Sequence, residues 1–443
     1  MKKKKFLAAA VAVALAGGMV FSFAGCDLLV KKPDNNYPYD GAVADGFTGT
    51  EAEWLASQYD AGTREHRLYE EAKQEGYTGS YLEFLKELGT GVTDDSAGIN
   101  RALTSVVAIE NVYRQETAYG SGVIISLDKT SGDAFIVTNY HVVYCVSSRY
   151  GTLGIGKDLR VGLYGGTGRT LSASFYGGAM EYDIAVLKVT GSEYLRETAE
   201  EPVYATAAQI ADSDSLTVGQ RVYALGNPDG EGFSATGGIV SVEAEQIEIT
   251  RADNNGKINL LEIRTDAAVN HGNSGGGLFD ASGRLVGIVN ARSESTGVVA
   301  FGYAIPANLA IPLARNIIDN YSSAGGNALV ARLGVTMKVQ EGKGVHDESS
   351  GKYFIEEKVV IDTVEMRSAA NAAGLKRGDT LISATLNRAG NSQTVQLTRL
   401  HKLSNLLMQA RFGDTLTLKV SREGKLTETT VNFNDASYFA TIR

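Results

Sequence analysis

The chain has few cysteines and no excess of positive charge, and each shortage excludes a class of protein. Its 443 residues include only 2 cysteines, too few for a disulfide framework or a cysteine-rich zinc site. Lys and Arg number 42 against 51 Asp and Glu, a formal net charge of −9. This balance argues against a nucleic-acid binder, which needs a basic face to neutralise phosphates. With 43% hydrophobic and 21% charged residues, the composition is that of globular domains, and the length suggests about three of them.

The first 26 residues have the pattern of an export signal. Lysines at positions 2–5 precede an apolar run over residues 6–24, the order found in secretory signals. The run ends at Gly25-Cys26, which resembles the lipobox of bacterial lipoproteins, whose cysteine is lipidated and becomes the mature N-terminus. An uncleaved anchor is the alternative, because the run is long enough to span a bilayer. Both interpretations place the remaining chain outside the cytoplasm, tethered to a membrane.

A short repeat lies within residues 27–98, where we expect a tether and a small helical region. The segment 46–55 matches the segment 76–85. Each copy has a capping-box pattern, with Thr50 or Ser80 three residues before a glutamate, and this pattern is typical of a helix start. A helical spacer is the favoured interpretation, and attachment to a cell-wall polymer or to another protein is the alternative.

From residue 99 the sequence changes to short β-branched runs separated by glycine-rich turns. This pattern is typical of an all-β barrel or sandwich. It continues to a predicted helix at 309–321, and the Ser- and Gly-rich stretch 322–326 is predicted to be a linker. We therefore predict a β domain over residues 99–322.

Three polar residues of this β domain have the types and the chain order of a catalytic triad. His141 follows an apolar strand, Asp183 precedes another, and Ser274 lies in a glycine-dense segment. A serine hydroxyl becomes nucleophilic when a histidine takes its proton, and an aspartate on the far ring nitrogen fixes the tautomer. The order His, Asp, Ser is that of chymotrypsin-like double β-barrels and differs from that of subtilisin and the α/β-hydrolases.

The segments 138–143, 183–189 and 272–278 resemble the three active-site motifs of the HtrA/Deg family of trypsin-like serine proteases. The resemblance implies a double β-barrel in which His141 is the general base, Asp183 its orienting carboxylate and Ser274 the nucleophile. It implies no metal and no cofactor.

The resemblance also implies the surroundings of the triad. An oxyanion hole is expected at Gly272, Asn273 and Ser274. A pocket for small or medium aliphatic side chains is expected, with Ala268 at its base and Asn290 and Ala291 in its walls. His271 and Gly277 depart from the family pattern, and we expect these two departures to affect the ordering of the oxyanion loop.

Residues 328–443 resemble a bacterial PDZ domain, which has an α/β fold. The segment 367–382 carries the resemblance, and Leu333, Gly334 and Val335 fit the loop that holds a peptide's terminal carboxylate through backbone N–H groups. A bound peptide would add as a strand beside that loop. A small domain that only packs on the protease is the alternative. The polar stretch 343–352 is predicted to be a mobile loop.

These features together predict a mainly β, membrane-tethered serine endopeptidase that cleaves unfolded or damaged exported proteins. Its PDZ unit would recruit peptide C-termini, and the resemblance implies a homotrimer. No nucleic-acid partner is expected. A proteolytically silent chaperone or scaffold on the same fold is the alternative function.

Overall fold

The computed structural model describes residues 69–70, 72–74, 77–79 and 95–442, apart from 115, 167–168, 199–201, 228–229, 291–300 and 349–350. Residues 95–443 form one compact unit and residues 1–94 another. The predicted signal segment with Cys26, almost all of the predicted repeat, and Ala291 lie outside the described residues. None of the helices in the described part of the chain is long and apolar enough to cross a membrane.

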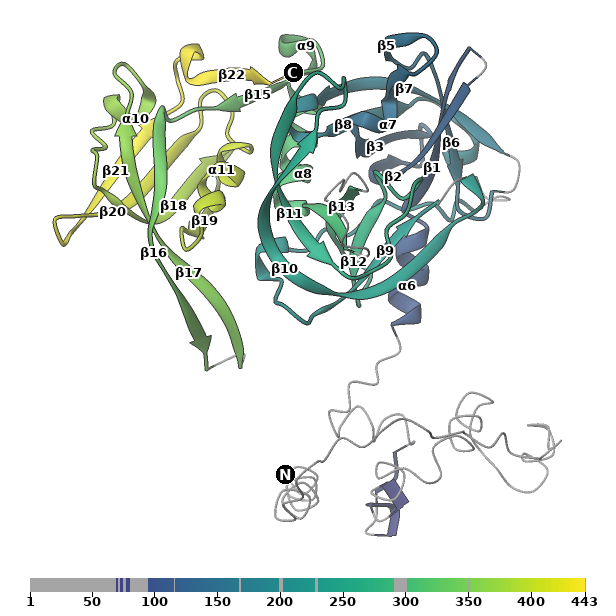
Figure 1. The fold of residues 1–443 in the computed structure, drawn as a ribbon, viewed down its shortest axis with the longest axis horizontal. Coiled ribbons are helices and arrows are strands. Elements are labelled where there is room, and N and C mark those ends of the chain that lie inside the picture. Colours follow the sequence, from purple (N-terminus) through teal and green to yellow (C-terminus); the bar gives the residue numbers. More distant parts are fainter. Residues whose placement is uncertain are drawn as a thin grey trace. The chain divides into compact units, whose positions relative to one another are not determined.

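A first closed β-barrel is built from strands β1 to β3 and β6 to β8 (Figure 1). Its strands are hydrogen-bonded in the order β1-β2-β3-β8-β7-β6, and each pair is antiparallel. β-branched side chains such as Val107, Ile109 and Ile136 fill its interior, as expected for strands with one buried face. The strands are β1 (Val106–Tyr113), β2 (Glu116–Asp128), β3 (Asp133–Asn139), β6 (Asp158–Leu163), β7 (Thr170–Ala179) and β8 (Ile184–Val189).

A second closed barrel follows, with strand order β10-β11-β14-β13-β12-β9. Val222, Ile263 and Val289 lie in its interior. The predicted double β-barrel is therefore confirmed. The strands are β9 (Arg221–Gly226), β10 (Ser234–Thr250), β11 (Lys257–Thr265), β12 (Gly277–Asp280), β13 (Leu285–Asn290) and β14 (Gly302–Pro306).

Short elements connect and flank the barrels. They are α6 (Ser96–Leu103), α7 (Tyr140–Val143), β4 (Tyr144–Ser147), β5 (Gly151–Ile155), η1 (Met180–Tyr182), η2 (Glu193–Leu195), η3 (Ser213–Ser215), α8 (Ala307–Asp319) and α9 (Tyr321–Ala324). Helix α8 is the predicted helix near 309–321, and it packs against β8 and β13. The prediction of an irregular linker at 322–326 is wrong in part, because α9 extends to Ala324. Gly325 then ends the helix in the left-handed conformation, which glycine adopts at little steric cost.

The C-terminal part is an α/β domain, as predicted. Its main sheet has the order β16-β17-β18-β20-β21, with β19 on β18, and β15 pairs with β22. In β20 the side chains of Leu416, Leu418 and Val420 alternate inward with polar residues, the period of a half-buried strand. The elements are β15 (Ala328–Ala331), β16 (Val335–Asp347), β17 (Lys352–Val364), α10 (Ala369–Ala372), β18 (Thr380–Arg388), β19 (Asn391–Gln396), α11 (Leu400–Leu407), β20 (Thr415–Arg422), β21 (Lys425–Asn432), η5 (Ala436–Tyr438) and β22 (Phe439–Ile442).

The stretch 343–352, predicted to be a loop, is mostly strand. It forms the end of the hairpin made by β16 and β17, whose pairing runs from Val335 opposite Val364 to Asp347 opposite Lys352. Cross-strand contacts support this end: Lys343 Nζ lies 3.1 Å from Glu356 Oε2, and the rings of His346 and Tyr353 stack at 4.5 Å. The prediction failed because these partners are polar, and a strand held by cross-strand pairs lacks an alternating apolar pattern.

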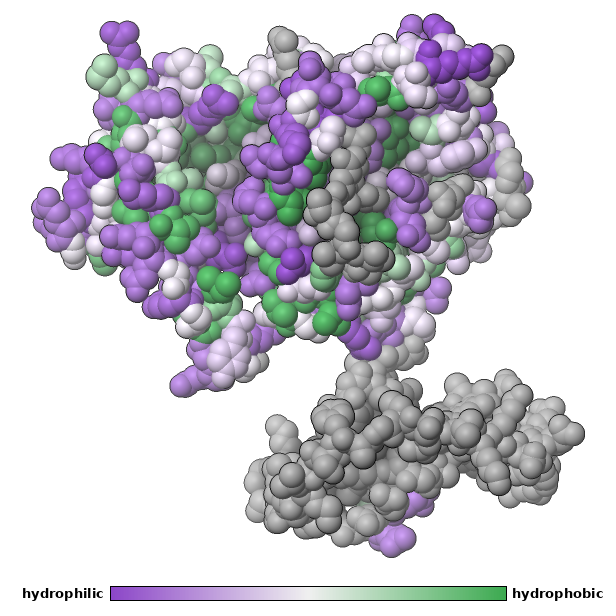
Figure 2. Space-filling model, in the orientation of Figure 1, coloured by the Kyte–Doolittle hydropathy of each residue, from purple (hydrophilic) through white to green (hydrophobic). Residues whose placement is uncertain are grey.

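The surface of this fold carries both hydrophilic and hydrophobic residues. On the face drawn in Figure 2, hydrophilic residues predominate and hydrophobic residues are in scattered patches. Such single exposed apolar residues are normal on a folded protein. The large apolar side chains that are fully buried, such as Phe279 and Phe433, lie in the cores.

A buried ion pair in the C-terminal domain gives a prediction for stability at low pH. Asp379 is 1% exposed, and its two oxygens accept hydrogen bonds of 2.7 Å each from Arg422. Burial opposes ionisation of Asp379, but Arg422 and the backbone N–H of Lys376 hold its pKa below the usual value. Because the pKa is lower in the folded state, the ion pair stabilises the fold at neutral pH. This stabilisation is lost as the pH falls from the usual aspartate pKa through the lower folded value.

We expect Asp379→Asn to lower the free energy of unfolding by about 2 kcal/mol at pH 7, since charged hydrogen bonds are weakened while Arg422 keeps its charge. Urea unfolding at pH 7 and at pH 3 measures this. The difference between the two proteins should shrink at pH 3. A constant difference would show that ionisation of Asp379 does not contribute.

Candidate active site

His141 and Asp183 meet at one end of the pair formed by β3 and β8. Asn139, the last residue of β3, is opposite Ile184, the first of β8. His141 therefore lies in α7 directly after β3, and Asp183 directly before β8. The left-handed backbone of Asp183, with φ of 51°, is one that aspartate tolerates better than most residues. The strand pairing thus places the two side chains together.

Two short hydrogen bonds join His141 and Asp183. The ring Nδ1 of His141 lies 2.7 Å from Asp183 Oδ2, and the backbone N–H of His141 donates to Oδ1 at 3.0 Å. Asp183 is 2% exposed. A carboxylate only accepts hydrogen bonds, so Nδ1 carries the hydrogen and Nε2 keeps its lone pair. This is the tautomer that a general base needs.

The loop with Ser274 is hydrogen-bonded to β2, the neighbour of the strand that leads to His141. The backbone N–H of Ser121 in β2 donates to Ser274 O at 2.8 Å, and Ser121 Oγ donates to Gly272 O at 2.7 Å. Thr138 Oγ1 in β3 donates to Ser121 O at 2.7 Å. Because Thr138 is three residues before His141, these bonds bring the serine loop to the end of β3. Ser274 itself is 7% exposed.

Gly275 is required for this close approach. Its φ is +82°, and a Cβ there would overlap Ser121 O and Thr138 Oγ1. Gly272 also has a positive φ, of +88°. The backbone N–H of Asn273 donates to Asn270 O at 3.1 Å, so this N–H is used inside the turn.

The two departures from the family pattern occupy different environments. His271 is exposed beside the serine loop. Gly277 is buried, and a Cβ there would overlap the ring of Phe279. The glycine therefore makes room for a core side chain.

Two of the three residues predicted for the substrate pocket, Ala268 and Asn290, are among the described residues, and their surroundings differ. Ala268 is exposed, and its carbonyl accepts from Thr236 Oγ1 at 2.7 Å. Asn290 is 1% exposed, and its Nδ2 donates to Glu262 Oε1 at 2.8 Å. The Asn290 side chain is thus hydrogen-bonded inside the protein, and its place in the pocket wall stays a prediction. Val269, the residue after Ala268, packs closely on Gly302, because a Cβ on Gly302 would lie 2.5 Å from Val269 Cγ2.

The predicted carboxylate-binding loop lies at the start of β16. Leu333 is buried, and its carbonyl accepts from the backbone N–H of Ala370 at 2.9 Å. Gly334 has φ of +71°, and a Cβ there would overlap Ser368 Cβ. Val335 begins β16, which has β17 on one side and contacts α11. A strand with α11 beside it is the arrangement that strand addition of a peptide uses.

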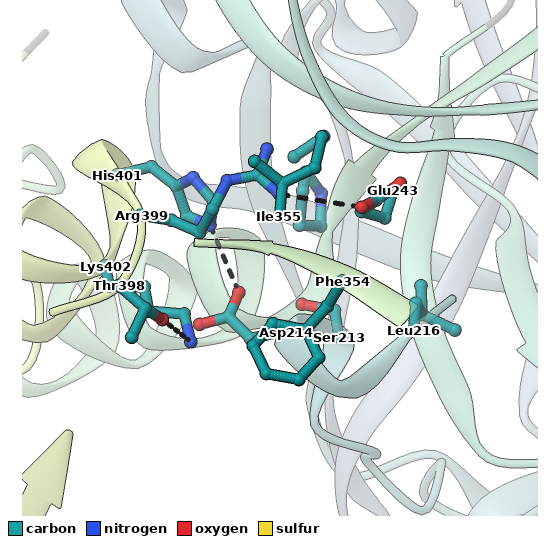
Figure 3. A pocket seen from close by; sticks show the side chains of 12 residues that line it. Ser213, Asp214, Leu216, Glu243, Phe354, Ile355, Thr398, Arg399, His401 and Lys402 are labelled. Carbon is teal, nitrogen blue, oxygen red and sulfur yellow. Dashed lines mark hydrogen bonds and ion pairs between the residues drawn. The ribbon is translucent and has the colours of Figure 1, made fainter. Parts of the chain in front are cut away.

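A separate cavity of about 230 Å³ lies between residues of the β domain and of the C-terminal domain (Figure 3). His401 Nε2 is 3.4 Å from Asp214 Oδ1 across it, and Arg399 is 3.6 Å from Glu243 Oε1. The pKa of Asp214 is lowered although burial opposes this, because His401 stabilises the charged form. None of the triad residues lines this cavity, and no sequence pattern predicted it.

Comparisons with known proteins agree with this geometry. Residues 120–288 match the family of trypsin-like peptidase domains, and residues 331–433 match PDZ domains. The serine protease Do-like HtrA of Lactococcus lactis subsp. lactis (strain IL1403) is 34% identical over 320 residues, which are 70% of this chain and 69% of that protein.

Two further relatives are similar. The serine protease Do-like HtrA of Bacillus subtilis (strain 168) is 30% identical over 351 residues, 78% of this chain and 70% of that protein. The periplasmic serine endoprotease DegP of Escherichia coli (strain K12) is 32% identical over 267 residues, 60% of this chain and 48% of that protein. With the double barrel, the His–Asp contact and the PDZ domain, these matches show that the chain belongs to the HtrA family of trypsin-like serine proteases.

Proposed function

We propose that this protein is an extracytoplasmic serine endopeptidase in which Ser274, His141 and Asp183 carry out peptide-bond hydrolysis. The contact of 2.7 Å between His141 Nδ1 and Asp183 Oδ2, with the serine loop hydrogen-bonded to the neighbouring strand β2, is the observation that carries the proposal. It leaves Nε2 of His141 as the base.

In this mechanism Ser274 Oγ attacks the carbonyl carbon of the scissile bond while His141 Nε2 takes the hydroxyl proton. Asp183 stabilises the imidazolium that forms. His141 then gives the proton to the leaving amine, and the C–N bond breaks to leave an acyl-enzyme. A water molecule, activated by the same histidine, releases the second product and restores Ser274.

The oxyanion of the tetrahedral intermediate would be bound by the backbone N–H groups of Gly272 and Ser274. We exclude the third predicted donor, Asn273, because its N–H donates to Asn270 O. One such donor typically contributes about 10²–10³ in rate. The positive φ of Gly272 supports this role, since a side chain there would strain the backbone that must face the oxyanion.

The substrates that we propose are unfolded or damaged exported proteins, cleaved after small or medium aliphatic side chains. Ala268 at the pocket base has no charge to pair with a basic side chain, and Gly302 keeps the adjoining wall close to Val269. Peptide C-termini would bind at Leu333, Gly334 and Val335 and add as a strand to β16.

The location and assembly are also proposals. The name of the Escherichia coli relative is that of a periplasmic enzyme, and the lysine-led apolar run supports export. We propose attachment to a membrane through lipidated Cys26 or an uncleaved anchor, with the segment 46–85 as a spacer, and assembly as a homotrimer.

Covalent labelling of Ser274 tests the proposed function. A fluorophosphonate probe should phosphonylate the full-length protein, because an activated serine oxygen displaces its fluoride. Peptide mass spectrometry should find the adduct at Ser274 and find none in Ser274→Ala. Ser282→Ala is the matched control, since Ser282 is exposed in the next turn and should leave labelling intact. Absence of an adduct in the native protein would refute the proposal.

A further inference from the structure

A buried carboxyl group lies in the second barrel outside the triad. Glu262 in β11 is 0% exposed. Its Oε1 accepts the hydrogen bond of 2.8 Å from Asn290 Nδ2. Its Oε2 is buried and has no hydrogen-bond partner among the residues that the structure describes. A buried carboxylate held by a single amide is costly, so this group needs an explanation.

The strands that carry Glu262 and Asn290 each contact one part of the candidate active site. Strand β11 packs against η1, the turn that ends at Asp183. On the other side, Asn290 follows Val289, whose carbonyl accepts from Gly275 N–H at 2.9 Å and whose N–H donates to Gly276 O at 2.8 Å. The bond between Glu262 and Asn290 therefore links the strand that holds the serine loop to the strand that packs against the aspartate turn.

The charges around Glu262 favour its neutral form. Glu245 of β10 lies directly opposite it in the strand register, and its Oε2 is 3.4 Å from Arg264. Tyr303 lies opposite both Arg264 and Asn290 in the register. Burial raises the pKa of Glu262 well above its usual range, and the charges of Asp183 and Glu245 raise it further, against the opposing effect of Asn290.

Asp183 and Glu262 thus differ in the hydrogen bonds that their carboxyl groups accept. Asp183 accepts two hydrogen bonds from His141, one at each carboxylate oxygen. Among the residues that the structure describes, Glu262 accepts a hydrogen bond from the Asn290 amide alone. A neutral Glu262 would hold Asn290 without placing a second negative charge near the triad.

We propose that Glu262 is a positioning residue for the proteolytic reaction. As an uncharged carboxyl it anchors Asn290, and through Val289 it fixes the strand against which the Ser274 loop is hydrogen-bonded. This inference rests on the proposed function.

Kinetics with a peptide substrate test the positioning role in the full-length protein. We expect Glu262→Ala to lower kcat about tenfold with KM changed less than twofold, because a small displacement of the serine loop slows the chemical step. Asn290→Ala should give the same loss, and the double variant no more than either single one. Glu262→Gln, which is neutral and of the same size, should restore kcat to within about threefold of the native value.

A matched control separates this role from a general effect of charge. Glu245→Gln removes the carboxylate directly opposite and should leave kcat within about twofold. If Glu262→Ala does not fold, Asn290→Ala still tests the proposal, because an unchanged kcat in that variant would overturn it. An unchanged kcat in a folded Glu262→Ala would do the same.

The pH profile of kcat/KM tests the protonation of Glu262. If Glu262 is neutral, the acid limb, on which His141 takes up its proton, coincides in native protein and Glu262→Gln. If Glu262 were ionised, its replacement would remove a negative charge near Asp183 and move the limb to lower pH. A shift of half a pH unit or more would overturn the neutral assignment. Loss of all labelling of native Ser274 would refute the proposed function, whereas equal labelling rates in native protein and Glu262→Ala would refute this inference alone.

Discussion

Ser274→Ala is expected to abolish proteolysis, with kcat falling about 10⁶-fold. The hydroxyl of Ser274 is the proposed nucleophile, and an alanine has no atom with which to form the acyl-enzyme. Cleavage of reduced casein, resolved by mass spectrometry, measures the loss. The termini of the native fragments also report the side chains accepted at Ala268.

Ser282→Ala provides the control for this experiment, because Ser282 lies in the turn between β12 and β13 and is exposed. It should cleave casein at the native rate. Fragments from Ser274→Ala at a rate similar to native would mean that another group is the nucleophile. No fragments from native protein, even with hydrophobic C-terminal peptides added, would instead favour the proteolytically silent alternative.

Asp183→Asn is expected to lower kcat about 10⁴-fold while the protein stays folded. Asp183 accepts hydrogen bonds from both the backbone N–H and the ring Nδ1 of His141. An asparagine has one oxygen in place of two, so its NH₂ group must face one of these donors or force the ring into the other tautomer. His141 Nε2 would then carry a hydrogen and could not accept the proton of Ser274.

The kinetics of Asp183→Asn with a peptide substrate measure this effect, and thermal unfolding reports whether the fold is retained. Asp266→Asn is the control, because Asp266 is exposed and its Oδ1 accepts from the Ile239 backbone. We expect a change in kcat below about threefold there. A loss smaller than tenfold in Asp183→Asn would contradict the role of Asp183 as the orienting carboxylate.

Some parts of the fold followed from local patterns. The β-branched runs of the barrels and the helix near 309–321 depend on neighbours within a few residues, and both were predicted close to their observed positions. The end of the hairpin formed by β16 and β17 was not predicted, because polar pairs such as Lys343 with Glu356 stabilise a strand only after its partner is in place.

The candidate site divides in the same way. The sequence by itself determined which residue types were available and in which order, and this was enough to name His141, Asp183 and Ser274 as the candidate triad. Only the tertiary structure showed that the Asn273 N–H is used inside the turn and that the buried Asn290 side chain donates to the buried Glu262. A strand residue lies on one face or the other by alternation, but alternation does not show what covers that face. Strand β11, which carries Glu262, contacts the turn that ends at Asp183, some 80 residues away in the chain, and only folding brings these two segments together.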